Sequence, residues 1–322
     1  MTGPDTRPAP TGKTPTRGRS SRRRGRGFLT AILFILPALV LFLVLVVAPI
    51  VIAAYLSLFK WNGIGPPTNF IGLDNFTRMF AATIFTGDLQ HMVILIGLSL
   101  LVQLPISLGL AVLLNQKIRG RAFYRLLFFA PYIISEAITA VLFSAIFSPE
   151  DGLANKILEA VGVDGGWTWL SEPETALWTV FLVITWKYFG FHMIIYLAGL
   201  QGIPKELTEA ARIDGADGWR VFRHITVPLL GPTIRISVFL SVIGAVQLFD
   251  LVYILTGGGP SHSSETFAVS MYDYGFRRTQ FGYASAFSMV MFLLSLVFAL
   301  GYQRWVLRRD LEGASTAMGD SR

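Results

Sequence analysis

The chain has 322 residues, of which 53% are hydrophobic and only 15% are charged, and its mean hydropathy is +0.56. Soluble domains carry about 25% charged residues, so this composition excludes an ordinary soluble globular protein and indicates a membrane protein. The net charge of +7 does not indicate a nucleic-acid partner, because eight of the 27 Lys and Arg residues lie in the first 27 positions.

Residues 1–27 are rich in Arg, Thr, Pro, Gly and Ser and have no apolar periodicity. This pattern predicts a disordered, basic cytoplasmic tail. The apolar run behind it is too long for the core of a signal peptide, which needs about 7–15 residues. The run Arg22-Arg23-Arg24 suits either a contact with anionic membrane lipid or, more simply, a charge anchor that sets topology. Gly12-Lys13-Thr14 resembles the end of a phosphate-binding loop, but Arg7 stands where that loop needs glycine.

Six apolar segments are long enough to cross a bilayer, which takes about 20 residues. The first contains Pro37 and Pro49, which predict a tilt or a kink. The predicted architecture is all-α, with one membrane domain over residues 28–306 and a cytoplasmic C-terminal tail over residues 307–322. In chain order the segments cover residues 29–59, 90–114, 122–147, 175–199, 232–255 and 282–306.

The connections between these segments alternate between many and few Lys and Arg residues. The N-terminal tail has eight, and the 115–125 turn, the 200–230 loop and the C-terminal end have four each. The 60–88, 148–174 and 257–281 loops have two, one and two. Since positive residues accumulate on the cytoplasmic side, both termini and the 200–230 loop are predicted to be cytoplasmic.

Two of the outer loops are predicted to contain short helices. The 148–174 loop is acidic, and its apolar residues recur at helical spacing, namely Leu153, Ile157, Leu158 and Val161. This pattern predicts an amphipathic helix on the outer surface. The last outer loop begins with a glycine-rich turn at 255–260 and continues into a helical stretch at 266–276.

Nothing in the sequence indicates chemistry carried by this chain itself. The histidines lie on different segments without the spacing of metal ligands, at His91, His192, His224 and His262. A nucleophile with its base cannot be assembled from the spacing either. The sequence therefore predicts no metal, no cofactor and no catalytic residue, and the absence of cysteine excludes disulfides and thiol chemistry.

The 200–230 loop is predicted to be an ordered element. Pro204 suits the first turn of a helix, and Gly215 can adopt the left-handed conformation that ends it. Asp217 can then cap a second helix, which Pro228 ends before the next membrane segment. An amphipathic hairpin resting in the membrane interface is the alternative. DNA binding is not expected of a helix pair tethered between two membrane helices.

The spacing in this loop resembles the cytoplasmic signature loop of ATP-binding-cassette (ABC) importer permeases. The matching positions are Glu209-Ala210-Ala211, Gly215, Ile225 and Pro228, while Val227 stands where the family more often has Leu. In that family the loop forms a coupling helix that inserts in a groove of the ATPase subunit. The resemblance implies a type I importer permease fold. It also implies an ATPase-binding region that comprises Glu209, Ala210, Ala211, Asp214, Gly215, Ala216, Phe222, Ile225 and Pro228.

Further segments resemble the carbohydrate-uptake branch of this family, and in particular its maltose-type first permease. They are residues 70–76, Trp186-Lys187, residues 197–201, residues 213–216, and residues 255–260 with Tyr272 and Phe276. The resemblance implies a bacterial inner-membrane protein that imports a disaccharide, an oligosaccharide or a polyol phosphate. Its implied partners are ABC ATPase subunits, a second related permease chain and an extracytoplasmic solute-binding protein.

Polar residues inside the apolar segments are candidates for the substrate path, because a charge at the centre of a membrane helix costs about 2.5–3.5 kcal/mol. Glu136 and Lys187 lie near the middle of the third and fourth segments, and they are predicted either to pair or to line the path. Further polar candidates are Gln103, His192, Gln247 and Asp250. Aromatic residues that could stack on sugar rings are Trp186, Tyr188, Phe189 and Phe249, although packing is the usual role of an aromatic residue in a membrane helix.

Two other functions compete with the importer. A gradient-driven secondary carrier would use Glu136 or Asp250 as its proton or cation site. A membrane-bound enzyme is the third possibility, which the lack of a clustered catalytic set argues against.

Overall fold

The computed structural model describes residues 33–163 and 166–307, in which the regular secondary structure is helical apart from one isolated β-bridge between Phe59 and Phe70. Both predicted tails, 1–27 and all but the first residue of 307–322, lie outside the described residues. The chain falls into two compact units, which divide between Ile52 and Ala53. Each unit is described by itself below, and the predicted single membrane domain stays a prediction.

Four continuous helices are long and apolar enough to cross a membrane, and they correspond to the first, second, fourth and sixth predicted segments. The helix that crosses the unit boundary covers Leu33–Leu56 and ends in α2 (Ala48–Leu56). In the second unit, α4 (Thr83–Leu98) and α5 (Leu104–Asn115) form one span that begins seven positions before the predicted residue 90. The other two spans are α9 (Pro173–Gln201) and Phe281–Val306, which contains α16 (Phe281–Tyr302).

The third and fifth predicted segments are not single helices. In the third, α6 (Arg121–Ile133) and α7 (Glu136–Ile146) meet at an angle of 96°. In the fifth, α13 (Gly231–Val246) ends nine residues before the predicted residue 255, and a separate helix, α14 (Asp250–Leu255), follows a break. The predicted apolar segments at 122–147 and 232–255 are therefore both interrupted. A second bend, of 67°, joins the helix Gly218–Leu229 to α13, and counting each bent helix pair as one crossing gives up to six spans.

Specific hydrogen bonds hold both breaks. At the first, the Ser135 side chain caps α7 by accepting a hydrogen bond from the N–H of Ile138 at 3.2 Å. At the second, the Thr266 hydroxyl donates to the Leu248 carbonyl at 2.8 Å. A broken helix frees backbone groups that must find other partners inside a membrane, and these side chains supply them.

A widened, π-helical turn precedes a proline at three places. The turns are η1 (Leu43–Val47), η2 (Ser99–Gln103) and η3 (Phe222–Thr226), which precede Pro49, Pro105 and Pro228. In each, the residue just before the proline donates its N–H to the carbonyl five residues back. Proline lacks an N–H and its ring crowds the carbonyl four residues back, so the wider turn accommodates it without ending the helix.

The core of the second unit consists of three clusters of buried apolar side chains. One packs α7, α9 and α14 together and contains Leu251. Another packs α5 against α9 and contains Met193. The third contains Phe267 and joins α4 and α16 to α15 (Phe267–Tyr272). Helix α9 contributes to two of the clusters, and its Gly190 approaches α6 so closely that an added Cβ would lie 1.8 Å from the carbonyl oxygen of Phe128.

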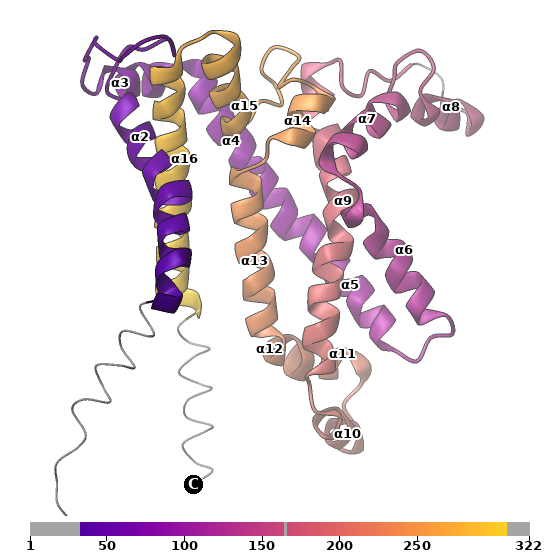
Figure 1. Ribbon diagram of the computed structural model, residues 1–322. Helices are drawn as coiled ribbons and strands as arrows, with labels where there is room; N and C mark the ends of the chain where they lie inside the picture. The colour runs from indigo at the N-terminus through magenta and orange to yellow at the C-terminus, as the bar shows by residue number, and fades with distance from the viewer. Residues whose placement is uncertain (1–32, 164–165, 308–322) are drawn as a thin grey trace, which may run out of the picture. The chain divides into compact units, whose positions relative to one another are not determined.

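Short helices lie at the two ends of α9 (Figure 1). One end leads into α10 (Lys205–Ile213), α11 (Gly218–Val221) and α12 (Val227–Leu229). The other end lies near α8 (Leu153–Ala160), and α3 (Asp74–Ala81) follows the first span. The predicted helix in the 148–174 loop is α8, and the predicted helix at 266–276 is α15 with the π turn η4 (Asp273–Arg277). Both predictions are confirmed.

Candidate functional site

The 200–230 loop folds as two helices joined by a tight turn. Helix α10 ends in a left-handed turn, in which the N–H of Gly215 (φ +84°) donates to the Arg212 carbonyl at 3.1 Å. The N–H of Ala216 donates to the Ala211 carbonyl at 2.9 Å. These two bonds form a Schellman motif, which satisfies carbonyls at the end of the helix and favours glycine at the left-handed position. The predicted role of Gly215 as a helix end is confirmed.

Asp217 begins the second helix, as the sequence predicts. Its carboxylate accepts a hydrogen bond from the N–H of Arg220 at 2.7 Å. The helix continues through the π turn and past Pro228 to Leu229, and then bends by 67° into α13. The expectation that Pro228 ends the helix was therefore wrong. Proline fits the first turn of α12, because its missing N–H has no intrahelical acceptor there.

Most residues of the resemblance-implied ATPase-binding region are accessible. Helix α10 buries no residue, and the side chain of Ile213 is 87% exposed. The region also contains exposed residues of the turn and half-buried residues of the second helix. The exposed members are Glu209, Ala210, Asp214, Gly215 and Pro228, and the half-buried ones are Ala211, Ala216, Phe222 and Ile225. An exposed isoleucine beside an alanine pair gives this helix a small apolar surface that another protein can approach.

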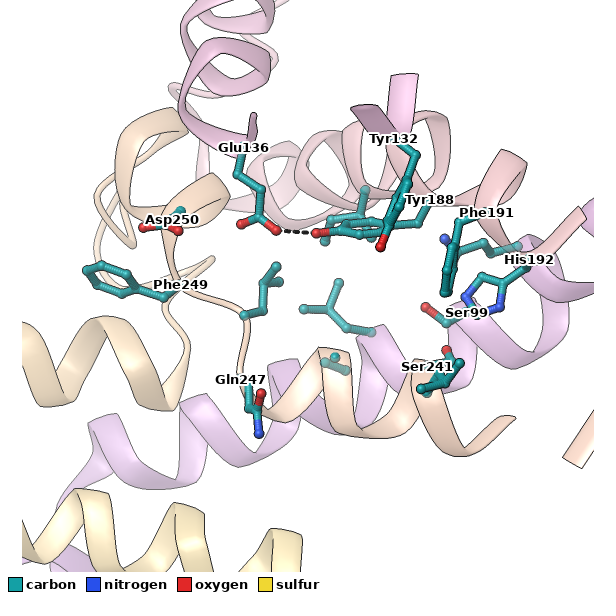
Figure 2. Close-up of a pocket in the computed structure, with 17 residues that line it drawn as sticks. Ser99, Tyr132, Glu136, Tyr188, Phe191, His192, Ser241, Gln247, Phe249 and Asp250 are labelled. Carbon is teal, nitrogen blue, oxygen red and sulfur yellow. Dashed lines mark hydrogen bonds between the residues drawn. The ribbon is translucent and has the colours of Figure 1, made fainter. Parts of the chain in front are cut away.

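A cavity of about 420 Å³ lies at the two helix breaks (Figure 2). Its walls come from α4 with η2, from α6 and α7, from α9, and from α13 with the residues that join it to α14. The broken third and fifth segments thus both contribute their interruptions to one cavity. Backbone irregularity at membrane depth is tolerated where it lines such a space, so the breaks and the cavity belong together.

One end of the cavity is acidic. Glu136 begins α7, and its carboxylate accepts a hydrogen bond from the hydroxyl of Tyr188 on α9 (Figure 2). Asp250 begins α14 and lies on the same side as Glu136 in Figure 2. Both carboxylates stand in the first turn of a helix, where the helix dipole favours negative charge.

Lys187 does not line this cavity. Its side chain is buried, and its ammonium donates a hydrogen bond to the carbonyl of Ile134, in the break between α6 and α7. The predicted Glu136–Lys187 relationship is thus replaced by two neighbouring bonds, Tyr188 to Glu136 and Lys187 to Ile134. Consecutive residues of α9 hold the two sides of one helix break.

The other end of the cavity is neutral and hydrogen-bonding. Gln103, His192 and Ser241 come from three different helices and are 2%, 4% and 8% exposed. The Nε2 of Gln103, the Nδ1 of His192 and the Oγ of Ser241 are buried without a hydrogen-bond partner among the described residues. Buried polar groups in native proteins are almost always hydrogen-bonded, so these three are available to a polar ligand or to water. His192 and Ser241 face the cavity beside Ser99 (Figure 2).

Aromatic rings line the space between the two ends. The rings of Tyr132 and Phe191 stack with centroids 4.6 Å apart and planes 19° apart. Phe249, in the break before α14, lies near the acidic end. Faces of this kind pack against the C–H surfaces of flat, polar molecules and leave their hydroxyls free to bond the polar ends.

The sequence thus identified part of the cavity. Of the six polar substrate-path candidates, Lys187 alone does not line the cavity; Gln103, Glu136, His192, Gln247 and Asp250 do. Two of the aromatic candidates, Tyr188 and Phe249, line it as well. Sequence reasoning missed four polar or aromatic lining residues, because single hydroxyls and aromatic rings in an apolar helix carry no pattern of their own. They are Ser99, Tyr132, Phe191 and Ser241.

The chain matches the family model of binding-protein-dependent transport system inner membrane components over residues 103–309. The chain belongs to this family. The match includes the 200–230 loop and all residues that line the cavity except Leu95 and Ser99.

Relatives of this permease extend the similarity to nearly the whole chain. The probable ABC transporter permease protein YurN of Bacillus subtilis (strain 168) is 38% identical, covering 83% of this chain and 92% of that protein. The diacetylchitobiose uptake system permease protein NgcF of Streptomyces coelicolor is 33% identical, covering 91% and 85%.

A solved structure has the same fold. The bacterial alginate ABC transporter in complex with alginate pentasaccharide-bound periplasmic protein matches with a TM-score of 0.78 and 26% identity. The match covers 90% of this chain and 98% of that chain. The permease is therefore an all-α, multi-pass inner-membrane component with the ABC importer permease fold, which favours the importer over the secondary carrier.

Proposed function

We propose that this chain is the membrane-spanning permease subunit of an ABC importer that takes up a sugar, and that it is driven by ATP hydrolysis in partner subunits. The observation that carries the proposal is the 200–230 loop, with its Schellman turn and exposed α10, in a chain of this family. The predicted cytoplasmic position of the loop and of both termini is part of the proposal.

The 200–230 loop is the proposed contact with an ATPase subunit. Helix α10 and the turn at Gly215 present Glu209, Ala210 and Asp214 to the solvent. The end of the second helix joins α13 through a 67° bend, and α13 lines the cavity. If the ATPase displaces the loop, α13 would therefore transmit the movement directly to the cavity wall.

The cavity is the proposed part of the sugar path that this subunit contributes, and a second, related permease chain would complete it. Its neutral end offers unpaired hydrogen-bonding groups at Gln103, His192 and Ser241, and its stacked rings offer faces to a sugar ring. The diacetylchitobiose and alginate systems among its relatives support a saccharide as the solute. The alginate transporter is in complex with a periplasmic protein that holds an alginate pentasaccharide, and we propose that a solute-binding protein delivers the sugar here. The chain itself would carry no catalysis.

The turn at Gly215 supplies the sharpest test. A Cβ at this position meets nothing within 4 Å, but the left-handed conformation costs an L-residue about 1–2 kcal/mol. Gly215→Val should therefore misdirect α10, and the ATPase should no longer copurify with the permease. Gly218→Ala is the matched control, because it lies in the same loop, has open space around it and has no positive φ.

Uptake then separates the importer from the secondary carrier. Proteoliposomes that contain the whole complex are loaded with ATP and offered radiolabelled maltose, diacetylchitobiose and an alginate oligosaccharide with the binding protein. Uptake of one of them should stop when ATP is omitted and persist with an uncoupler. Uptake that ignores ATP and stops with the uncoupler would overturn the proposal.

A further inference from the structure

A second cavity, of about 580 Å³, lies between the 57–73 loop and the beginning of α16, at the opposite end of the chain's helices from α10 (Figure 1). The loop is closed by the Phe59–Phe70 bridge. The buried Asn75 amide donates to the carbonyls of Ser57 and Phe59 at 2.8 and 3.0 Å. The backbone of the loop is therefore held in place by the bridge and by a buried side chain.

The loop and α16 also pack closely against each other at Gly282. The N–H of Gly282 donates to the carbonyl of Trp61 at 3.1 Å. A Cβ on Gly282 would lie 2.0 Å from the Phe59 carbonyl oxygen, so no other residue fits. The 57–73 loop and the beginning of α16, which are far apart in the sequence, are therefore held at a fixed separation, and this fixes the shape of the cavity.

The charge in this cavity has one sign. Lys60 and Arg78 line it together with Asn, Thr, Gln, Trp and Tyr side chains, and no Asp or Glu is among the lining residues. Neither cation forms an ion pair within the part of the chain that the structure describes. Elsewhere in the outer loops, Lys156 pairs with Asp151, and Arg277 pairs with Asp273. The cavity thus keeps two cations without a partner carboxylate.

Arg78 is positioned to receive such a partner. Its guanidinium lies over the ring of Tyr283, with 4.5 Å between the guanidinium carbon and the ring centroid. A guanidinium in such a cation–π contact keeps a planar fork of N–H donors, whose spacing matches the two oxygens of a carboxylate.

We propose that this cavity binds a carboxylate, and that the carboxylate is an acidic side chain on the solute-binding protein. This inference rests on the proposed function, which puts this end of the helices outside the cell. Charge complementarity selects an anion over a cation, and the planar fork of Arg78 selects a carboxylate over a spherical anion. The solute has its own cavity near Gln103 and His192, so the outer cavity is left for the protein that delivers it.

The test measures how the binding protein stimulates the ATPase activity of the complete reconstituted complex. Lys60→Gln and Arg78→Gln should each raise the binding-protein concentration for half-maximal stimulation by about tenfold at low salt. Activity without the binding protein should not change. The difference from the unmodified complex should shrink as salt is added, because exposed charges are screened. Lys156→Gln is the matched control, since this exposed outer lysine lies outside the cavity and should leave the half-maximal concentration unchanged.

A charge exchange identifies the occupant. Acidic surface residues of the binding protein are changed one at a time to lysine, and one of these changes should restore stimulation of Lys60→Glu. Galacturonate serves as the free carboxylate probe in thermal unfolding of the complex without binding protein. If galacturonate protects the unmodified complex but not Lys60→Gln, and no exchange restores stimulation, the occupant is a free anion and the docking proposal is wrong.

Two further results are decisive. If Lys60→Gln and Arg78→Gln leave the half-maximal concentration unchanged at low salt, the cavity does not dock the binding protein. If instead the unmodified complex shows no stimulation by any binding protein, the proposed function fails, and that failure is visible before any variant is compared. Arg78→Lys keeps the charge but loses the planar fork. Arg78→Lys should raise the half-maximal binding-protein concentration, but by less than Arg78→Gln does. A half-maximal concentration equal to that of the unmodified complex would exclude a role for the fork.

Discussion

The hydroxyl of Tyr188 on α9 donates a hydrogen bond to the carboxylate of Glu136, the first residue of α7. One position earlier on α9, Lys187 donates to the carbonyl of Ile134, on the other side of the break before α7. Two consecutive side chains of one helix therefore hold both sides of a 96° bend in another. The bend directs Glu136 into the cavity, so the shape of the proposed sugar path depends on these two bonds.

Tyr188→Phe removes only the hydroxyl that holds Glu136. We expect a loss of about 1 kcal/mol in the free energy of unfolding, because Glu136 is half-buried and water replaces part of the lost bond. The rate of uptake should fall more clearly, since Glu136 loses its orientation. Thermal unfolding and uptake by the reconstituted complex measure the two effects. Tyr124→Phe in α6 is the control, because the Tyr124 hydroxyl has no hydrogen bond within the described part of the chain. Equal effects of the two changes would contradict the role of the Tyr188 bond.

Lys187→Met leaves the Ile134 carbonyl without its donor. Because Lys187 is buried, we expect this change to cost about 1–3 kcal/mol in the free energy of unfolding. The double variant Glu136→Gln with Lys187→Met should be no more stable than Lys187→Met alone, since each residue has its own bonding partner. A double-mutant cycle in thermal unfolding gives the answer. If the double variant is more stable than Lys187→Met alone, the result supports the direct Glu136–Lys187 ion pair that the sequence suggested.

The sequence was informative where local rules decide the structure. In the 200–230 loop, a left-handed glycine at 215 and a capping aspartate at 217 act within a few residues, so both could be predicted. The existence of the four uninterrupted spans was predictable for the same reason, because about twenty apolar residues in a row need no distant partner.

The helix breaks were missed because they depend on distant residues. Lys187 supports Ile134 across 53 positions, and Thr266 supports Leu248 across 18. Averaging hydropathy over a long window hides such a break, although Ser135 before Glu136 has the form of a helix cap. The cavity follows from the breaks, and its position could therefore not be predicted beyond its most polar residues.

Gly190 tests the packing that places α9 against α6. An added Cβ would lie 1.8 Å from the Phe128 carbonyl oxygen, and a backbone atom cannot move aside as a side chain can. We expect Gly190→Ala to separate the two helices, with a loss of about 1–3 kcal/mol or more in the free energy of unfolding and little uptake. Gly109→Ala in α5, where nothing lies within 4 Å of the added Cβ, should be neutral or slightly stabilising. Thermal unfolding of the two variants compares them, and similar midpoints would exclude this close approach.

Ser270 joins two buried carboxyl groups near the N-terminal end of α4. Its hydroxyl oxygen lies 2.6 Å from Oδ2 of Asp88 and 2.8 Å from Oε1 of Glu265, and all three residues are nearly inaccessible. Ser270→Ala leaves both carboxyl groups without this partner in a site that water does not reach. The expected loss is about 1–3 kcal/mol in the free energy of unfolding.

Two comparisons separate this linking role from the loss of any buried hydroxyl. Ser144→Ala removes a hydroxyl that bonds only the carbonyl of Ala140 in its own helix, so it should be nearly neutral in thermal unfolding. Asp88→Asn should be milder than Asp88→Ala, because the amide can still bond Ser270 and fills nearly the same space. If Ser270→Ala is as mild as Ser144→Ala, the hydroxyl does not hold α4 to α15. If Asp88→Ala is the milder aspartate variant although alanine also leaves a cavity, the bond between Asp88 and Ser270 does not stabilise the protein.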